Sequence, residues 1–214
     1  MDCIKRKWAR TMNKEKKLIV FEGISGAGKS TIINLLMRRL ENVDGINVKM
    51  SSLMDDVQKT NSVDFKNSKY YLLLEELKTI LFEDSTKELI VFERYYISAL
   101  AHAYALNKID NNPTIYNELF KWYTNNIGNR LTMPDIYIVF DLPLDVSLAR
   151  IQKRNQKVTD EIWIDKDYLL FCEEYKNNFL KNVESNIKVF RIDANNDIEY
   201  VYNEVIKILK ELEA

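Results

Sequence analysis

The chain has 214 residues, of which 46% are hydrophobic and 29% are charged, the balance of an ordinary globular domain with a sizeable core. Its formal net charge of −1 argues against general binding of nucleic acids or membrane surfaces, and no apolar run approaches the roughly 20 residues that span a bilayer. The two cysteines match no metal-binding spacing, and such sparse use of cysteine fits a cytoplasmic protein.

The N-terminal stretch differs in composition from the rest of the chain. Residues 1–16 are rich in Lys and Arg and show little apolar periodicity. Because loose basic termini are common, we predict a flexible basic extension over residues 1–16 and a single folded domain over residues 17–214. A targeting or nucleic-acid-binding arm is the alternative interpretation of this stretch.

From Leu18 onward, short apolar runs alternate with longer helical patterns. The predicted strands are Leu18–Phe21, Val48–Ser51, Leu89–Phe92, Ile136–Phe140 and Lys188–Ile192. The predicted helices are Ser30–Leu40, Ser68–Phe82, Ile97–Leu106, Thr114–Asn125, Leu144–Arg154, Asp167–Leu180 and Ile198–Leu212. Continuous apolar strands are typical of a parallel sheet covered on both faces. We therefore predict a three-layer α/β domain with a five-stranded parallel sheet, which would bind ligands at the carboxyl ends of its strands.

A glycine-rich motif follows the first predicted strand at once. The residues Gly23-Ile24-Ser25-Gly26-Ala27-Gly28-Lys29-Ser30 fit the P-loop pattern G-x-x-x-x-G-K-[ST]. Glycines allow the backbone to wrap closely round phosphate oxygens, and the N–H groups of such a loop form an anion nest at the start of a helix. We expect Lys29 to reach the β- and γ-phosphates of ATP. The hydroxyl of Ser30, with Thr31 beside it, is expected to hold Mg²⁺.

The third predicted strand ends in the sequence Glu93-Arg94-Tyr95, beside the expected position of the phosphate loop. Glu93 is a candidate to bind Mg²⁺ through water or to orient the acceptor hydroxyl. Arg94 is a candidate to bridge the donor and acceptor phosphates, because the guanidinium fork suits phosphate geometry. A surface ion pair at the end of a strand is the simpler alternative.

Basic residues also follow the fourth predicted strand, and they suggest a helical lid. Arg150 and Arg154 are four residues apart and so share one helix face, with Lys153 and Lys157 nearby. The phosphate loop has no basic residue between its first and last glycines, so a lid arginine would supply the positive charge that a migrating phosphoryl group needs. We assign Arg154 to catalysis and Arg150 to nucleotide binding. A solvated basic helix face is the alternative.

Taken together, these motifs resemble the thymidylate kinase family and its deoxynucleoside kinase relatives. Phe21-Glu22-Gly23 resembles the start of the family's phosphate loop, and Glu93-Arg94-Tyr95-x-x-Ser98 resembles its Asp-Arg-Tyr-x-x-Ser element. Arg150, Arg154 and the pair Asp193-Ala194 also fit the family pattern, over a span from about Lys17 to Leu212. The resemblance implies a homodimeric phosphotransferase that uses ATP and Mg²⁺. It also implies that Tyr95 and Ser98 bind the acceptor and that Ala194 lies at the nucleotide.

The sequence departs from the family pattern mainly at the acceptor side. Thymidylate kinases usually carry Arg-Glu-Pro after the second strand, where the arginine helps to hold the acceptor phosphate, whereas this chain has Ser51-Ser52-Leu53-Met54-Asp55-Asp56. Lys78 stands where a second acceptor arginine is usual, and Ala101-His102-Ala103 replaces the usual Ala-Tyr-Gln. Glu93 replaces the usual aspartate, as in deoxynucleoside kinases. The donor chemistry is thus better defined than the acceptor.

Two acceptors remain open, and they demand different chemistry. A nucleoside monophosphate already carries an ionised oxygen, because its second pKa is roughly 6, and needs only positive charge to hold it. A sugar hydroxyl gains typically about 10²–10⁴-fold from a carboxylate base, for which Asp55, Asp56 and Glu93 are candidates. Lys78 and the Tyr-x-x-Ser pattern favour the monophosphate. Our first choice is conversion of dTMP to dTDP, with Lys78 and Asp55 at the substrate, and a deoxynucleoside kinase is the alternative.

Single side chains that would recognise the base are harder to choose. The aromatic residues Phe65, Tyr70, Tyr71 and Tyr104 could stack on an acceptor base, but at helical spacing they fit a core better. For His102, the only histidine of the chain, we expect a structural role on its helix.

The sequence Asn107-Lys108-Ile109-Asp110 points to another class of protein, because it matches the guanine-reading motif Asn-Lys-x-Asp of regulatory GTPases. That motif should follow a strand, yet here it ends a helical pattern. The chain also has no Asp-x-x-Gly motif, with which a GTPase switch senses the γ-phosphate. A GTPase-like switch is therefore only a remote alternative.

Overall fold

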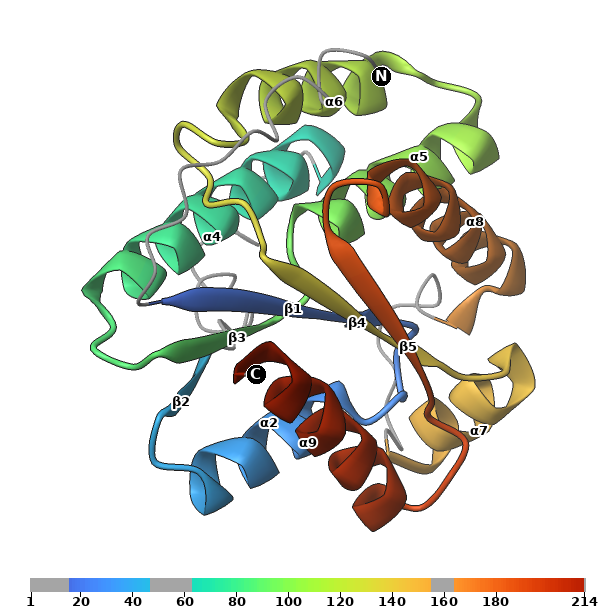
Figure 1. Ribbon diagram of the computed structural model, residues 1–214. Coiled ribbons are helices and arrows are strands. Elements are labelled where there is room, and N and C mark those ends of the chain that lie inside the picture. Colours follow the sequence, from blue (N-terminus) through green and yellow to red (C-terminus); the bar gives the residue numbers. More distant parts are fainter. Residues whose placement is uncertain (1–15, 47–62, 155–163, 214) are drawn as a thin grey trace.

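The computed structural model describes residues 16–46, 63–154 and 164–213, which form a three-layer α/β structure (Figure 1). The strands of the described part are β1 (Lys17–Gly23), β2 (Val43–Ile46), β3 (Leu89–Glu93), β4 (Ile136–Asp141) and β5 (Lys188–Asp193). They form one parallel sheet in the order β2-β3-β1-β4-β5, which confirms the predicted five-stranded parallel sheet. Because β3 and β4 flank β1, the carboxyl ends of these three strands meet at the middle of one sheet edge.

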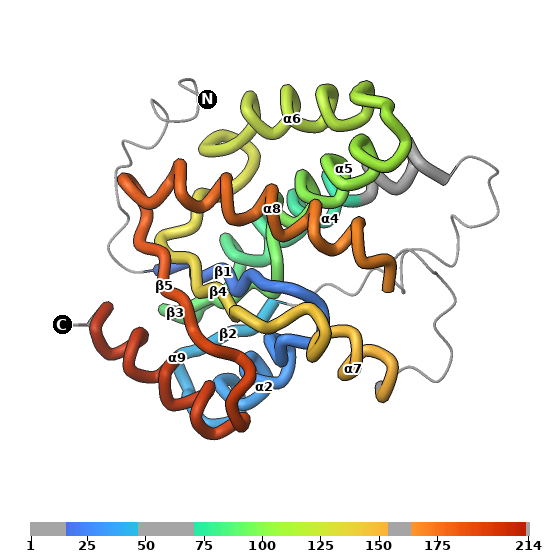
Figure 2. The backbone as a smooth tube through the Cα atoms, turned by 90° about the vertical axis from the view of Figure 1, so that its right-hand side faces the viewer, coloured from blue at the N-terminus to red at the C-terminus, as the bar shows by residue number. Residues whose placement is uncertain are grey.

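Helices cover both faces of this sheet. The described helices are α2 (Lys29–Arg39), α4 (Val63–Asp84), α5 (Tyr96–Asp110), α6 (Thr114–Asn126), α7 (Leu144–Arg154), α8 (Lys166–Val183) and α9 (Ile198–Glu213). Figures 1 and 2 show α2 and α9 on one face and α4, α5 and α8 on the other, with α6 outside α5. Each predicted helix is present, and most bounds differ from the prediction by only a few residues.

The central strands form because nearly every side chain in them is apolar and covered. Leu18 to Phe21 in β1 and Ile90 to Phe92 in β3 have no exposed surface. Burying such a side chain contributes roughly 1.5–3 kcal/mol relative to leaving it in water. These strands therefore fix the sheet, and the loops that follow them are held on a rigid support.

The second strand of the sheet, β2, lies in a segment for which no strand was predicted. The structure forms β2 over Val43–Ile46, whereas the predicted range 48–51 lies outside the described residues. The sequence Val-Asp-Gly-Ile has weak strand propensity, since Asp and Gly are both depleted in strands. Gly45 is required because a Cβ atom there would come within 2.4 Å of Ile33 and 2.5 Å of Met37 on α2. The close packing of α2 against this edge strand explains why β2 forms here, although its amino-acid composition does not predict a strand.

Of the predicted basic extension, only Lys16 lies within the described residues. Its ammonium donates a hydrogen bond of 2.8 Å to the carbonyl oxygen of Glu83 near the end of α4. A lysine at that position satisfies a carbonyl that the helix leaves unpaired. Within the described ranges, no helix combines the length and the apolar character that crossing a bilayer requires.

Candidate active site

The glycine-rich loop turns sharply from β1 into α2. Gly23 has a φ of 133°, and a Cβ atom there would lie only 2.5 Å from the carbonyl oxygen of Phe140 on β4. No other residue type fits this position without moving the sheet. Gly28, with a φ of 87°, directly precedes the first residue of α2. The positive end of the α2 dipole therefore faces the loop, as anion binding requires.

Lys29 lies inside this loop and is only 3% exposed. Its ammonium donates hydrogen bonds to the carbonyl oxygens of Gly23 (3.0 Å) and Ile24 (2.9 Å). Burial lowers the pKa of Lys29 well below its usual value, and the positive charges of Arg94 and Lys176 lower it further. An anion placed in the loop would relieve this penalty and stabilise the charged ammonium.

Ser30 and Glu93, the two predicted magnesium ligands, lie together at the loop. The Ser30 hydroxyl donates a hydrogen bond of 2.8 Å to Oε1 of Glu93. Thr31, which follows in the first turn of α2, is exposed. A hydroxyl and a carboxylate at the head of a phosphate loop are the hard oxygen donors that Mg²⁺ prefers.

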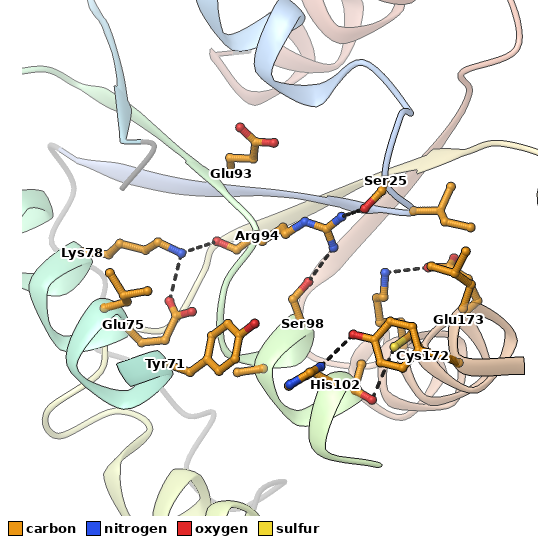
Figure 3. Close-up of a pocket in the computed structure, with 17 residues that line it drawn as sticks. Ser25, Tyr71, Glu75, Lys78, Glu93, Arg94, Ser98, His102, Cys172 and Glu173 are labelled. Atoms are coloured by element: carbon orange, nitrogen blue, oxygen red, sulfur yellow. Dashed lines mark hydrogen bonds and ion pairs between the residues drawn. The ribbon is translucent and has the colours of Figure 1, made fainter. Parts of the chain in front are cut away.

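Arg94 is held in an unusual conformation between the loop and α5. It is one of two described residues other than glycine with positive φ, at 59°, and such strain costs about 1–3 kcal/mol. Its backbone N–H donates to the carbonyl oxygen of Phe21 over 2.9 Å. Its guanidinium donates to the hydroxyls of Ser25 (3.1 Å) and Ser98 (3.3 Å), as Figure 3 shows. The cation therefore joins the loop to the neighbouring cavity.

Glu22 supports this arrangement, although sequence reasoning gave it no role. The residue has no exposed surface, and its carboxylate accepts hydrogen bonds from the backbone N–H of Tyr95 (3.1 Å) and the hydroxyl of Ser98 (2.7 Å). A lone acidic residue inside an apolar strand is the signal that points to such a task. Glu22 thus fixes the start of α5 against the end of β1.

The other side of the loop is bounded by α7 and the end of β5. Arg150 donates hydrogen bonds from Nη1 to the carbonyl oxygens of Gly26 (3.2 Å) and Ala194 (3.1 Å). Ser147, which the sequence analysis did not single out, donates a hydrogen bond of 2.6 Å to the carbonyl oxygen of Ser25. Two residues assigned to the nucleotide, Arg150 and Ala194, therefore meet beside the loop. Arg154 ends α7, and the position of its side chain lies outside the described part.

A cavity of about 300 Å³ opens next to the loop, between α4 and α8 and above α5 (Figure 3). Ser25, Glu93 and Arg94 line the end of the cavity that borders the loop. The polar and aromatic residues on its helical walls are Tyr71, Glu75 and Lys78 from α4, Ser98 and His102 from α5, and Tyr168, Cys172, Glu173 and Lys176 from α8. The cavity therefore combines cations near the loop with aromatic rings farther along.

A buried ion pair forms the α4 wall. Lys78 is 5% exposed, and its ammonium donates to Oε2 of Glu75 (3.1 Å) and to the carbonyl oxygen of Arg94 (3.0 Å). Burial raises the pKa of Glu75 to about 7, against the opposing charge of Lys78. Lys78, predicted to bind substrate, thus lines the cavity and also holds the strained backbone of Arg94.

Aromatic rings gather round His102 at the other end of the cavity. Nδ1 of His102 lies 2.7 Å from the hydroxyl of Tyr168, and its ring centroid lies 5.4 Å from that of Tyr71. Burial lowers the pKa of His102 to about 4, so the imidazole is neutral at pH 7. Flat, mostly apolar surroundings with a few polar edges suit a heterocyclic base. His102 lines the cavity beside Tyr168, which α8 brings to it from far along the chain, so this location could not be read from the sequence.

Tyr95 requires a correction. We expected it to bind substrate, but its side chain has no exposed surface and does not line the cavity. Its hydroxyl is 2.8 Å from that of Thr79, so the ring packs between β3 and α4. Ser98 does line the cavity, and Asp55 lies outside the described residues.

The sequence Asn-Lys-Ile-Asp forms the last turn of α5 and follows no strand. This position argues against a role in guanine recognition of the kind found in regulatory GTPases.

The family model and the curated relatives agree on one family. The family model described as "Thymidylate kinase" matches residues 21–205. The chain is 28% identical to "Probable thymidylate kinase 1" of Saccharolobus solfataricus, over 91% of this chain and 97% of that protein. It is 24% identical to the thymidylate kinase of Latilactobacillus sakei, over 90% and 94% of the two chains.

Solved structures show the same fold. A structure of deoxyadenosine kinase from M. mycoides with dCMP and dCDP superimposes with a TM-score of 0.72 at 23% identity, and covers 91% of this chain and 99% of that one. The dATP-bound form of that kinase gives a TM-score of 0.71 at 23% identity, with 90% and 98% covered. With its P-loop, the family match over most of its length and this shared fold, the chain belongs to the thymidylate kinase family of phosphotransferases.

Proposed function

We propose that this enzyme transfers the γ-phosphoryl group of ATP to a deoxynucleoside monophosphate, with dTMP as the preferred acceptor. The position of Arg94 is the observation that favours this function most, since its guanidinium contacts Ser25 of the phosphate loop and Ser98 of the adjoining cavity. A cation in that position can neutralise two anionic substrates at once. The curated relatives are named as thymidylate kinases, which favours dTMP as the acceptor.

ATP and Mg²⁺ are the cofactors that the loop fits. The narrow turn at Gly23, the buried ammonium of Lys29 and the start of α2 make a cradle for a polyphosphate. Ser30 and Glu93 supply two oxygen donors, and Mg²⁺ in nucleotide enzymes uses few protein ligands besides phosphates and water. When bound, the ion neutralises charge on the phosphate oxygens. Arg150 and Ala194, which meet beside the loop, are proposed to contact the nucleotide where it leaves the loop.

The protein's main task in this reaction is to position two anions and to neutralise their charge. A monophosphate needs no base, because its second pKa is roughly 6 and an ionised oxygen is available at neutral pH. Holding the reactants in line and surrounding the moving phosphoryl group with fixed positive charge lowers the barrier. Lys29 binds the phosphates of the donor, and Arg94 binds those of both the donor and the acceptor. The neutral rings of Tyr71, His102 and Tyr168 are left to receive the base of the acceptor.

A deoxynucleoside kinase is the second candidate, and Glu93 is the residue that favours it. The carboxylate of Glu93 lines the cavity and could accept a proton from a sugar hydroxyl. It is hydrogen-bonded to Ser30, however, and in Figure 3 it points away from Ser98 and His102. These features fit a metal ligand better than a base directed at the acceptor.

A coupled assay of ADP release tests the choice between the two acceptors. The panel comprises dTMP, dCMP, dAMP and dGMP together with the four corresponding deoxynucleosides. We expect the highest kcat/KM with dTMP and negligible turnover of free nucleosides. Turnover of nucleosides alone would overturn the proposal and identify the second function.

We also propose that the enzyme works in the cytoplasm as a homodimer. Among the described residues, α4 presents an apolar stripe on its outer surface: Leu73 (61% exposed), Leu77 (36%), Ile80 (52%) and Leu81 (38%). These positions share one helix face. Exposed apolar stripes of this kind commonly mark interfaces between proteins.

A further inference from the structure

Lys176 on α8 is a buried cation for which the reaction described so far has no use. The residue is 5% exposed and lines the same cavity as Ser25, Arg94 and Ser98. Lysine is almost never buried to this degree unless it is paired. Its ammonium lies 2.5 Å from Oε1 of Glu173, one helical turn earlier on α8. The pair faces the active site, so a solvated surface role is excluded.

The surroundings of the pair connect it to the phosphate site. Lys176 is one of the charges that lower the pKa of Lys29, the lysine of the phosphate loop. Burial by itself raises the pKa of Glu173, but the charge of Lys176, and after it that of Arg94, outweighs burial and leaves the pKa lowered. Lys176 and Arg94 thus act on one region, where the charges of both stabilise the ionised carboxylate of Glu173.

Apart from Arg94, the cations beside the cavity already have other partners or tasks. The ammonium of Lys78 has two acceptors, Glu75 and the carbonyl oxygen of Arg94. Lys29 lies in the phosphate loop, which binds the donor nucleotide. The segment Ser51–Asp56, where thymidylate kinases usually carry an acceptor-binding arginine, contains no basic residue. An ammonium has three donors, and within the described ranges Glu173 is the one acceptor recorded for Lys176. As far as the described residues go, its remaining donors are left for a ligand in the cavity.

We propose that Lys176 binds the phosphate group of the acceptor, from the wall opposite Lys78. Figure 3 shows α4, with Lys78 and Glu75, and α8, with Cys172 and Glu173, on two sides of Arg94. A phosphate at Arg94 would then have a cation on each side. The inference rests on the proposed function, because it assumes that the acceptor carries a phosphate. Its consequence is selectivity: the contact favours a nucleoside monophosphate over the free nucleoside.

Calorimetric titration with dTMP and with thymidine tests this role directly. The variant Lys176→Met keeps the apolar stem and removes the charge, and Lys181→Met removes an exposed lysine from the same helix as a matched control. We expect Lys176→Met to weaken dTMP binding by roughly ten- to a hundredfold, the range for a hydrogen bond to a charged group, and to leave thymidine binding unchanged. Lys176→Arg should retain most of the affinity for dTMP. Equal weakening of both ligands would overturn the proposal.

The double variant Glu173→Gln/Lys176→Met separates binding from charge balance. It removes both buried charges. The double variant should therefore fold even if Lys176→Met is destabilised by the unpaired carboxylate of Glu173. Weak dTMP binding in the double variant supports the contact, whereas recovery of wild-type affinity would show that Lys176 only neutralises Glu173. If the wild-type enzyme turns over nucleosides alone and these variants still lose affinity for dTMP, the proposed function fails, and Lys176 binds the phosphate of the product dTMP and not that of an acceptor. If the wild-type enzyme does not bind dTMP, both are overturned.

Discussion

The ammonium of Lys78 donates a hydrogen bond of 3.0 Å to the main-chain carbonyl oxygen of Arg94, and so joins α4 to the most strained residue of the site. Arg94 has a φ of 59°, which a residue with a side chain adopts only when its surroundings enforce it. Through this bond, the buried pair of Lys78 and Glu75 holds the main chain at Arg94, from which the guanidinium reaches Ser25 and Ser98. The pair therefore supports the residue that we propose to bind both phosphates.

Removal of Lys78 should affect both stability and turnover. In Lys78→Met the carbonyl of Arg94 loses its donor and Glu75 loses its partner, and breaking a buried pair in this way costs about 3 kcal/mol. We expect urea unfolding to show this loss in the free energy of unfolding. We also expect kcat to fall, because Arg94 is no longer held in place. The double variant Lys78→Met/Glu75→Gln should regain most of the stability but little of the activity. Full recovery of kcat in the double variant would show that Arg94 is positioned without Lys78.

Glu75 should make the stability of the enzyme depend on pH. Its pKa rises from 4.5 to about 7 on folding, so the folded state binds more protons between these values and stability falls as pH rises from about 4.5 to 7. The expected loss is on the order of 3 kcal/mol. His102, with its pKa lowered to about 4, has the opposite slope, so the measured quantity is the difference between wild type and Glu75→Gln.

Urea unfolding of the wild type and of Glu75→Gln at pH 5, 6, 7 and 8 gives this difference. The stability of the wild type relative to the variant should decrease up to about pH 7 and then level off. A difference that does not change with pH would mean that the Glu75 carboxyl is already ionised at pH 5.

Lys29 should be required for turnover but not for folding. Lys29→Ala removes the loop's own cation and should lower kcat by at least about a hundredfold, the usual loss for one group that stabilises developing charge. Removal of a buried ammonium should leave the melting temperature unchanged or raise it. Lys188→Ala, at an exposed position on β5, is the control. Undiminished turnover of Lys29→Ala would refute the assigned role.

The apolar stripe on α4 should hold two copies of the chain together. Leu77→Lys and Ile80→Lys place a charge within the stripe, and sedimentation velocity should show a shift from dimer to monomer. Leu170→Lys is the matched control, since Leu170 is 52% exposed on α8. A wild-type protein that sediments as a monomer, or variants that remain dimeric, would exclude this interface.

The parts of the fold and site that the sequence predicts are those with local signals. The phosphate loop has its own motif, and Glu93 and Arg94 follow a strongly apolar strand. The strand β2 at Val43–Ile46 was not predicted because its signal is not local: Gly45 is explained only by the approach of α2. Secondary-structure propensity contains no information on such a contact.

The cavity wall shows the same limit. Lys78 and Lys176 are 98 positions apart in the numbering, and only the packing of α4 and α8 around α5 brings them to one cavity. The spacings Glu75–Lys78 and Glu173–Lys176 are equally typical of solvated helix faces, which is why neither ion pair was identified. Tyr95 was misassigned because a motif gives the residue type but not the direction of its ring.

The most direct test of the account is ³¹P NMR of the wild-type enzyme with ATP, Mg²⁺ and an equimolar mixture of dTMP and thymidine. We predict that dTMP is consumed and that dTDP and ADP appear in equal amounts, while thymidine remains. Conversion of thymidine to dTMP without formation of dTDP would contradict the assignment of a monophosphate as the acceptor.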